Sequence, residues 1–312
     1  MKLGVWIALA IGAIAGLSQI GLSEGTTTTV DCDAGGTIGA ALTTLRPGDT
    51  LLVKGTCREN VTIAAESHRL TLDGQGQATI DAPDPGPAAV AITGREIALK
   101  GFTITGGRNG VNVLRGGTAL IANNVIHHTG PDGRPGAGEG VNVGQHSFAR
   151  FIGNTIRDNP VSGIVVHENG AVRIGFTDVD NPAAAGNTIE GNGGSGIRVT
   201  TSANARITGN TIRRNGQDGV EVSGGSNAHV SGNVISGNGG SGIRVTQTSS
   251  VQLGADEGEG LLAAFNSTDP TLLNGGAGLT CAVGGSVDGR LGSLNGRDGP
   301  KRFDETCIDS LR

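Results

Sequence analysis

Apolar residues recur along the chain in pairs separated by one position, and each pair begins directly after a glycine. The pairs are Val111/Val113, Val141/Val143, Ile164/Val166, Ile197/Val199, Val220/Val222 and Ile243/Val245. Eight residues after each pair comes another apolar position: Ile121, Phe151, Ile174, Ile207, Val230 and Leu253. Residues two apart on a β-strand point to the same side. We therefore expect short strands whose apolar residues face inward and stack in columns.

The spacing of these pairs indicates a repeat. The decapeptide GNGGSGIRVT occurs at 191–200 and again at 237–246, a separation of 46 residues or two steps of 23, with a degenerate copy, RNGQDGVEVS, at 214–223. A period of this length is typical of coils stacked along an axis. Coils of short strands pair with their neighbours at about 4.8 Å, and handedness rules favour right-handed connections. The sequence predicts an all-β, single-domain, right-handed parallel β-helix.

Asparagines mark one corner of each coil. Asn124, Asn154, Asn187, Asn210 and Asn233 open units of the form N-x-I, and in four of these units a second asparagine follows after five residues: Asn159, Asn192, Asn215 and Asn238. Asparagine tolerates turn conformations and can hydrogen-bond main-chain groups. Stacked amides can also form ladders, so we expect a structural role. Insertions at 131–138, 176–185 and 255–264 break the period and predict loops on the solenoid.

The ends of the chain differ from the repeats. A signal peptide is predicted over 1–23, because Lys2 is followed by an apolar run from Leu3 to Leu17. This run is short for a membrane anchor, which is therefore the weaker alternative. We expect an N-terminal cap and first strands over 24–60, repeats over 61–253, and irregular coils with a cap over 254–312. A helix within 37–45 would cover the open end of the stack. No later segment is apolar enough to span a membrane, and we expect a secreted or periplasmic monomer.

The four cysteines form two local groups at the ends of the repeat region. Four cysteines allow three connectivities, and we favour the local pairs, Cys32 with Cys57 and Cys281 with Cys307. Such pairs would tie down the terminal coils in an oxidising compartment. A cysteine metal site is disfavoured because no cysteine has a second cysteine or a histidine close by in the sequence.

Charge and aromatic content restrict the class of partner. The net charge is −5 without a long basic run, which argues against nucleic acid. The chain has no tyrosine, and its single tryptophan, Trp6, lies in the predicted signal peptide. Neutral sugar chains usually rest on Trp or Tyr, so a neutral polysaccharide is disfavoured as a ligand.

Two segments carry a family resemblance: GDTLLVKGTCRENVTI at 48–63 and LTLDGQGQATIDA at 70–82. They resemble the opening of secreted right-handed β-helix proteins of the pectate-lyase-like superfamily, which includes carbohydrate-binding and sugar-hydrolase members. Cys57 stands where the usual pattern has an aromatic residue. The resemblance covers the fold from about Asp31 to Leu253 and implies carbohydrate as ligand, without identifying one enzyme family. Together with the lack of aromatic platforms, it implies an acidic polysaccharide or cell-surface glycan as the partner. Polyuronate lyases of this superfamily work on a strand face with acidic metal ligands and an Arg or Lys base.

The residue between the two apolar members of each pair should point outward. These residues are Asn112, Asn142, Val165, Arg198, Glu221 and Arg244, with Glu139, His167, Glu168 and Asp218 flanking them. Arg198 or Arg244 could neutralise a uronate carboxylate, and His167 could act as the base because its pKa can sit near neutrality. The alternative is an ordinary cross-strand ion-pair arrangement.

A second outward column is uniformly basic: Arg150, Arg173 and Arg206 with His229. Like charges on neighbouring strands are unfavourable without a partner, so this column is a candidate for binding an anionic polymer unless loop carboxylates neutralise it. No cofactor is required by any motif. Calcium is the one ion for which we predict ligands, Asp178 and Asp180 with Asn181, or separately Asp256, Glu257 and Glu259. The alternative is a solvated acidic loop.

The sequence contains one pair of adjacent histidines. His127 and His128 would point to opposite faces of a regular strand and chelate poorly.

The sequence leaves two functions open. The first is binding, with eliminative cleavage, of an acidic polysaccharide. The second is a non-catalytic surface or adhesion protein, which the regularity of the repeats favours.

Overall fold

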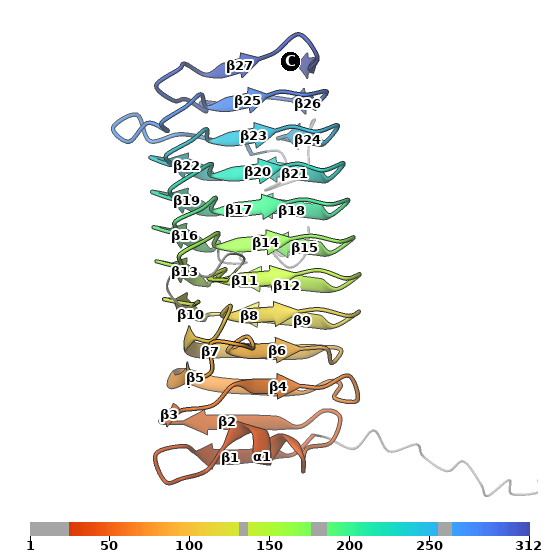
Figure 1. The fold of residues 1–312 in the computed structure, drawn as a ribbon, viewed down its shortest axis with the longest axis vertical. Helices are drawn as coiled ribbons and strands as arrows, with labels where there is room; N and C mark the ends of the chain where they lie inside the picture. Colours follow the sequence, from red (N-terminus) through yellow and green to blue (C-terminus); the bar gives the residue numbers. More distant parts are fainter. Residues whose placement is uncertain (1–24, 131–136, 176–185, 255–263) are drawn as a thin grey trace, which may run out of the picture.

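The computed structural model describes residues 25–130, 137–175, 186–254 and 264–312, and these residues wind into a parallel β-helix (Figure 1). Each turn adds one coil on top of the last, so the chain rises steadily from its first strands to its C-terminus. The predicted signal peptide and most of the three predicted insertions lie outside the described residues. Among the described residues, no helix is long and apolar enough to cross a membrane.

Three strand faces run the length of the stack. The first face is a ten-stranded sheet of β4 (Val61–Ile63), β6 (Val90–Ile92), β8 (Val111–Val113), β11 (Val141–Val143), β14 (Ile164–Val166), β17 (Ile197–Val199), β20 (Val220–Val222), β23 (Ile243–Val245), β25 (Leu279–Cys281) and β27 (Lys301–Phe303). Its strands pair in parallel and in register, so that Val141 lies opposite Ile164 and Val143 opposite Val166.

The second and third faces belong to one larger sheet because the long strands β5 (Thr71–Ala82) and β7 (Ile97–Gly106) run through both. The second face also holds β1 (Thr27–Asp31), β2 (Thr50–Lys54), β9 (Thr118–Ala122), β12 (Phe148–Ile152), β15 (Ala171–Ile174), β18 (Asn204–Thr208), β21 (Asn227–Ser231), β24 (Ser250–Leu253), β26 (Ser286–Gly289) and β28 (Ile308–Leu311). The third face holds β3 (Thr56–Cys57), β10 (Val125–His127), β13 (Thr155–Arg157), β16 (Thr188–Glu190), β19 (Thr211–Arg213) and β22 (Val234–Ser236).

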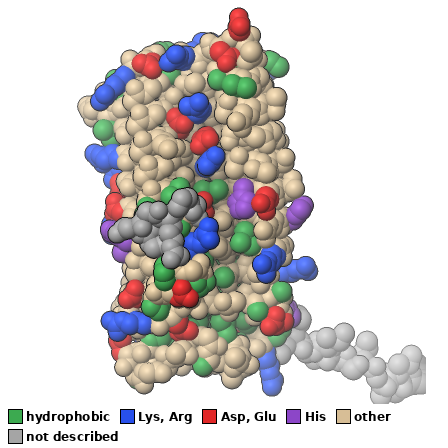
Figure 2. All heavy atoms as spheres, in the orientation of Figure 1, with side chains coloured by type: hydrophobic (Ala, Val, Ile, Leu, Met, Phe, Trp, Pro, Cys, Tyr) green, Lys and Arg blue, Asp and Glu red, His purple; other side chains and the backbone are tan. Residues whose placement is uncertain are grey.

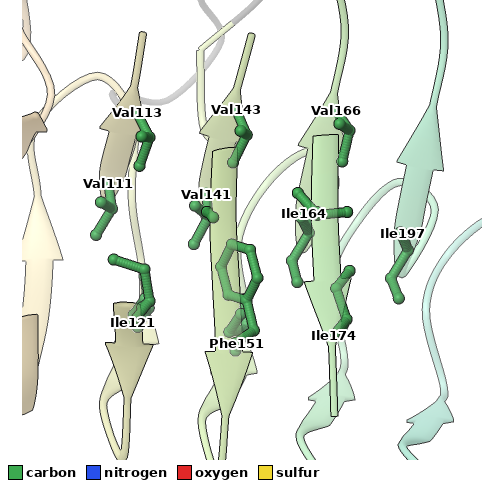
Figure 3. Packing of buried hydrophobic residues seen from close by; sticks show 14 of the residues in the cluster. Val111, Val113, Ile121, Val141, Val143, Phe151, Ile164, Val166, Ile174 and Ile197 are labelled. Carbon is green, nitrogen blue, oxygen red and sulfur yellow. The ribbon is translucent and has the colours of Figure 1, made fainter. Parts of the chain in front are cut away.

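The predicted aliphatic columns form the core. Every residue of the six pairs is fully buried, as are the apolar residues eight positions later. Figure 3 shows Ile121, Phe151 and Ile174 on one side of the core and the paired residues of β8, β11 and β14 on the other. The alternation of buried and outward positions therefore follows the spacing of the sequence, and it places the middle residue of each first-face strand on the outside.

Both asparagine columns are buried ladders, which confirms their structural role. Asn154 Nδ2 donates to Asn187 Oδ1 (2.8 Å), and its backbone N–H donates to the same oxygen (2.9 Å). Asn192 bonds Asn215 in the same way. The ladders extend further than the sequence indicated, through Asn266 and Asn274. Each amide thus satisfies the polar groups of a turn that would otherwise be buried without partners.

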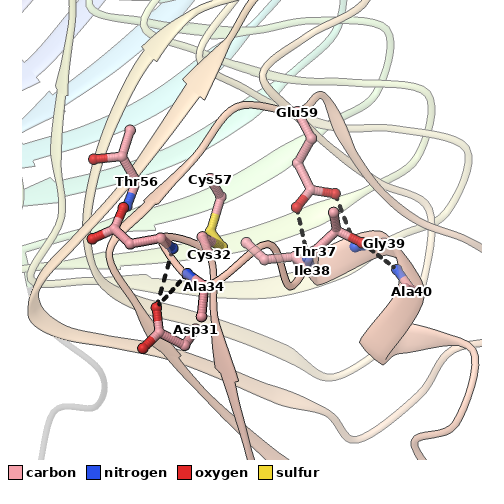
Figure 4. Close-up of a disulfide and its surroundings, with 11 residues drawn as sticks. Asp31, Cys32, Ala34, Thr37, Ile38, Gly39, Ala40, Thr56, Cys57 and Glu59 are labelled. Carbon is pink, nitrogen blue, oxygen red and sulfur yellow. Dashed lines mark hydrogen bonds between the residues drawn. A yellow bond between two sulfur atoms is a disulfide. The ribbon is translucent and has the colours of Figure 1, made fainter.

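The N-terminal helix and both disulfides are present as predicted. Helix α1 (Ile38–Leu42) begins at Thr37, whose hydroxyl accepts a hydrogen bond from Ala40 N. The carboxylate of Glu59 accepts from Ile38 N (2.6 Å) and Gly39 N (2.9 Å), which suits the positive end of a helix. Cys57 lies two residues before this glutamate and is bonded to Cys32 (Figure 4). The second predicted pair, Cys281–Cys307, is also present.

Candidate functional site

The outward column of the first face is confirmed by the strand register. Asn142 lies opposite Val165, Val165 opposite Arg198, Arg198 opposite Glu221, and Glu221 opposite Arg244. Figure 2 shows acidic and basic side chains interspersed along the middle of this side of the molecule. Val165 departs from the expectation of an exposed position, because it is only 7% exposed. It lies beneath its polar neighbours and contributes an apolar patch to the surface of a cleft.

That cleft has a volume of about 590 Å³ and brings together four of the predicted residues: Glu139, Asn142, His167 and Arg198. A second hollow, of about 360 Å³, is lined by Asp218, Glu221 and Arg244. Arg198 lines both. The predicted residues therefore form two adjoining recesses along the helix axis. Glu168 lines neither of these two recesses.

The imidazole of His167 is held in a defined position. It lies against Gly144 of the neighbouring coil so closely that a Cβ on that glycine would come within 2.5 Å of Nε2. Its other nitrogen, Nδ1, is 3.7 Å from a carboxylate oxygen of Glu168. The absence of a side chain at Gly144 thus makes room for the ring.

Among the described residues, two buried polar atoms of the cleft residues have no hydrogen-bond partner, His167 Nε2 and Asn142 Oδ1. Asn142 and His167 come from neighbouring coils, on β11 and directly after β14. Most buried polar atoms in folded proteins are paired, so these two leave unsatisfied polar groups in the wall of the cleft.

Two carboxyl groups occupy equivalent positions in their coils, each directly before the glycine that starts a first-face strand: Glu139 and Asp218. Burial raises the pKa of Glu139, against the opposing charges of Arg108 and Arg198. Burial also raises the pKa of Asp218, against the hydrogen bond from Ser241 N (2.6 Å) and the charge of Arg244. Both groups hold their proton to a higher pH than an ordinary carboxyl does.

In the predicted ladder of alternating charges, only one of the two arginines opposite Glu221 forms an ion pair among the described residues. Arg198 Nε is 3.5 Å from Glu221 Oε2, and Ser195 Oγ donates to the same oxygen (3.2 Å). Within the described part of the chain, Arg244 takes part in no ion pair. The arginine side chains are thus not all committed to the carboxylates of the ladder.

The second basic column is also in register. Arg150 lies opposite Arg173, Arg173 opposite Arg206, and Arg206 opposite His229. Arg173, Arg206 and His229 line a groove of about 780 Å³ on the second face. Arg150 lies outside the lining, and its guanidinium carbon is 5.8 Å from the ring centre of Phe148, which does line the groove. The structure therefore places these arginines on a different face from the cleft.

The prediction that His127 and His128 point to opposite faces of a strand was wrong. His127 Nδ1 and His128 Nδ1 are 2.7 Å apart. The reason is local: His128 has a φ of +49°, a left-handed conformation that ends the strand alternation and turns the second ring back toward the first. Burial lowers the pKa of His127, and the charge of Arg157 adds to this effect.

The predicted calcium ligands Asp178 and Asp180, like Asn181, lie outside the described residues, as do Asp256, Glu257 and Glu259. Sequence reasoning also overlooked two cleft residues, Arg108 and Asn109. Asn109 accepts a hydrogen bond from Glu139 N (3.2 Å). The sequence contained a signal for Asn109, because this residue directly precedes Gly110 just as Glu139 directly precedes Gly140.

Comparisons with known proteins agree with this architecture. The family model described as "Right handed beta helix region" matches residues 88–256, more than half of the chain. An alginate lyase from Paenibacillus sp. str. FPU-7 superposes with a TM-score of 0.58 at 13% identity, covering 91% of this chain and 99% of the lyase. The A-module of the Azotobacter vinelandii mannuronan C-5 epimerase AlgE6 gives a TM-score of 0.47 at 16% identity, covering 93% and 91%.

No curated protein sequence matches the chain. At 13% identity the superposition on the alginate lyase shows the architecture and not the activity. The family match covers the coils that carry the cleft, and its handedness agrees with the right-handed winding predicted from the repeats. The chain belongs to the right-handed β-helix family.

Proposed function

We propose that the protein binds an acidic polysaccharide along the first face and cleaves it by β-elimination in the cleft. One observation carries the proposal: a single cleft joins a cationic side chain, an imidazole and a half-buried carboxyl group, namely Arg198, His167 and Glu139. These are the three kinds of group that an elimination next to a carboxylate requires.

Each group has a distinct role in the proposed reaction. The guanidinium of Arg198 neutralises the uronate carboxylate, so that the proton on the adjacent carbon becomes more acidic. The imidazole of His167 takes that proton. The electron pair left behind forms a carbon–carbon double bond, and the bond to the neighbouring sugar's oxygen breaks. Glu139 donates its proton to that leaving oxygen, a role suited to a carboxyl whose pKa is raised by burial.

Charge favours an acidic polymer over a neutral one. Arg108 and Arg198 line the cleft, and Arg244 lines the adjoining hollow without an ion-pair partner in the described chain. The sequence has no tyrosine and only one tryptophan, Trp6, so the aromatic platforms that usually carry neutral sugars are lacking. Because Arg198 lines both recesses, a chain bound along the axis could occupy both with successive sugars.

The test is ultraviolet absorbance during incubation with a panel of uronate polymers, with and without calcium. Elimination leaves a conjugated double bond that absorbs where the substrate does not. A rise on one polymer would establish lyase activity and name its substrate. A flat trace across the panel, with circular dichroism showing folded protein, would refute cleavage.

The second candidate function is a non-catalytic surface or adhesion protein that uses the coil as a rigid rod. The near-identical repeats and the Arg198–Glu221 ion pair favour it, because both occur in ordinary structural sheets. Against it, the predicted residues gather in two recesses and do not spread evenly along the rod. In either case we propose a secreted or periplasmic monomer, consistent with two disulfides.

A further inference from the structure

The second face carries a row of like charges that the proposed reaction does not use. Arg150, Arg173 and Arg206, here called the arginine column, lie on β12, β15 and β18 and are directly opposite one another. Adjacent strands are about 4.8 Å apart, so three guanidinium groups project from consecutive coils. The protein as a whole has a net charge of −5, and the column is therefore a local positive feature on an acidic molecule.

Two members of the column, Arg150 and Arg206, differ from the paired charges elsewhere on the coil. None of the ion pairs between described residues includes either of them. Both side chains are exposed. By contrast, Arg213 on the third face meets Glu190 of the preceding coil at 2.7 Å. The charges of Arg150 and Arg206 are therefore accessible to an anionic ligand.

The surroundings of the column are suited to a polyhydroxylated ligand. The groove of about 780 Å³ is lined by Arg173 and Arg206 and by the outward amides Asn204, Asn227 and Gln252. Amide side chains offer both donors and acceptors, and guanidinium groups bind carboxylates in a planar, two-point geometry. The lining residues come from successive coils, and the row that begins with Arg173 and Arg206 continues through His229 and Gln252 to Asp288. The groove therefore runs along the axis and is cationic at the end nearer the N-terminus.

We propose that this groove is a second binding site for an acidic polysaccharide, lying along the helix axis on a different face from the cleft. The polymer class is that of the proposed function and rests on it, whereas the binding itself requires no cleavage. The groove would hold a long chain on the protein while another part of that chain occupies the cleft. Linking two modest sites in this way raises overall affinity without new contacts at either one.

The experiment is affinity electrophoresis of the folded protein through gels containing polygalacturonate or polymannuronate, with a neutral glucan as the control polymer. All proteins carry His167→Ala so that the polymers stay intact. The groove variant is Arg150→Gln/Arg206→Gln. The matched control is Arg58→Gln/Arg95→Gln, which removes the same charge from exposed arginines nearer the N-terminal end. Thermal denaturation of each variant checks that the fold is retained.

We expect the groove variant to bind a uronate polymer about fivefold more weakly than the control variant, because two exposed charge contacts are lost, and to melt no lower than it. Equal affinity of the two variants would overturn the proposal. So would double-stranded DNA that binds as tightly as the uronate polymer and depends on the same two arginines. A groove effect combined with a flat absorbance trace for the protein with His167 intact would refute cleavage and leave the second site standing.

Discussion

The first and second faces of this coil are built from strands of the same regularity, yet they present different chemistry. On the first face, charges of both signs alternate, burial raises the pKa of two carboxyl groups, and two buried polar atoms lack partners among the described residues. On the second face, charges of one sign repeat in register, and two of the three arginines are exposed. A site with charges of both signs and unpaired buried polar atoms is suited to proton transfer, whereas a row of positive side chains is suited to binding a polyanion.

The largest expected effect comes from removing the imidazole. His167→Ala should reduce turnover of the uronate polymer by about 10²–10⁴-fold, the usual contribution of a general base. Affinity for the polymer should change little, since Arg198 remains. The measurement is the initial rate of absorbance increase, with binding followed separately by electrophoresis. An unchanged rate would remove His167 from the mechanism.

Replacing one arginine by glutamine on each face tests whether the two faces have different roles. Arg198→Gln should lower kcat on short oligouronates roughly 10²-fold, because a charge that stabilises the transition state is lost. Arg206→Gln should leave kcat on those short substrates unchanged and raise KM only on long polymers. Comparable losses of kcat in both variants would contradict the division of roles between the two faces.

A smaller effect should follow from filling the space beneath the imidazole. Gly144 is not in a left-handed conformation, so the backbone accommodates alanine, but the new methyl group would meet His167 Nε2 at 2.5 Å. The ring must then move, and misplacement of a catalytic group costs about 10- to 100-fold in rate. In a His167→Ala background, Gly144→Ala should have no further effect on rate. Additive losses in the double variant would show that the glycine acts independently of the ring.

The fold followed from the sequence because its determinants are periodic. Pairs such as Val141/Val143 fix which residues face inward, and the asparagine ladders fix the turns. Asn266 and Asn274 were missed because their unit departs from the pattern: Asn266 begins Asn-Ser-Thr and not N-x-I, and Asn274 follows it after eight residues and not five.

The site was predictable only in part, for reasons of local geometry. The register of Arg198 and Glu221 followed from the repeat, whereas the unpaired Nε2 of His167 depends on a ring position that Gly144 permits. The contact between His127 and His128 depends on one left-handed residue. Positions of side chains along a strand can be read from the sequence, but their rotamers and the backbone departures at strand ends cannot.

The smallest effect, and the one most specific to the first face, concerns pH. Burial raises the pKa of Glu139, so in the range between its ordinary and its raised pKa the folded protein binds more protons than the unfolded chain. The free energy of unfolding therefore falls as the pH rises through that range. Glu139→Gln should remove this part of the decline. The free energy of unfolding of this variant, measured by urea denaturation from pH 4 to 8, should therefore fall less than that of the wild type. Arg206→Gln should leave the slope unchanged, because the exposed guanidinium stays charged throughout. A Glu139→Gln profile parallel to that of the wild type would show that the carboxyl is ionised in the cleft, and would exclude it as the proton donor.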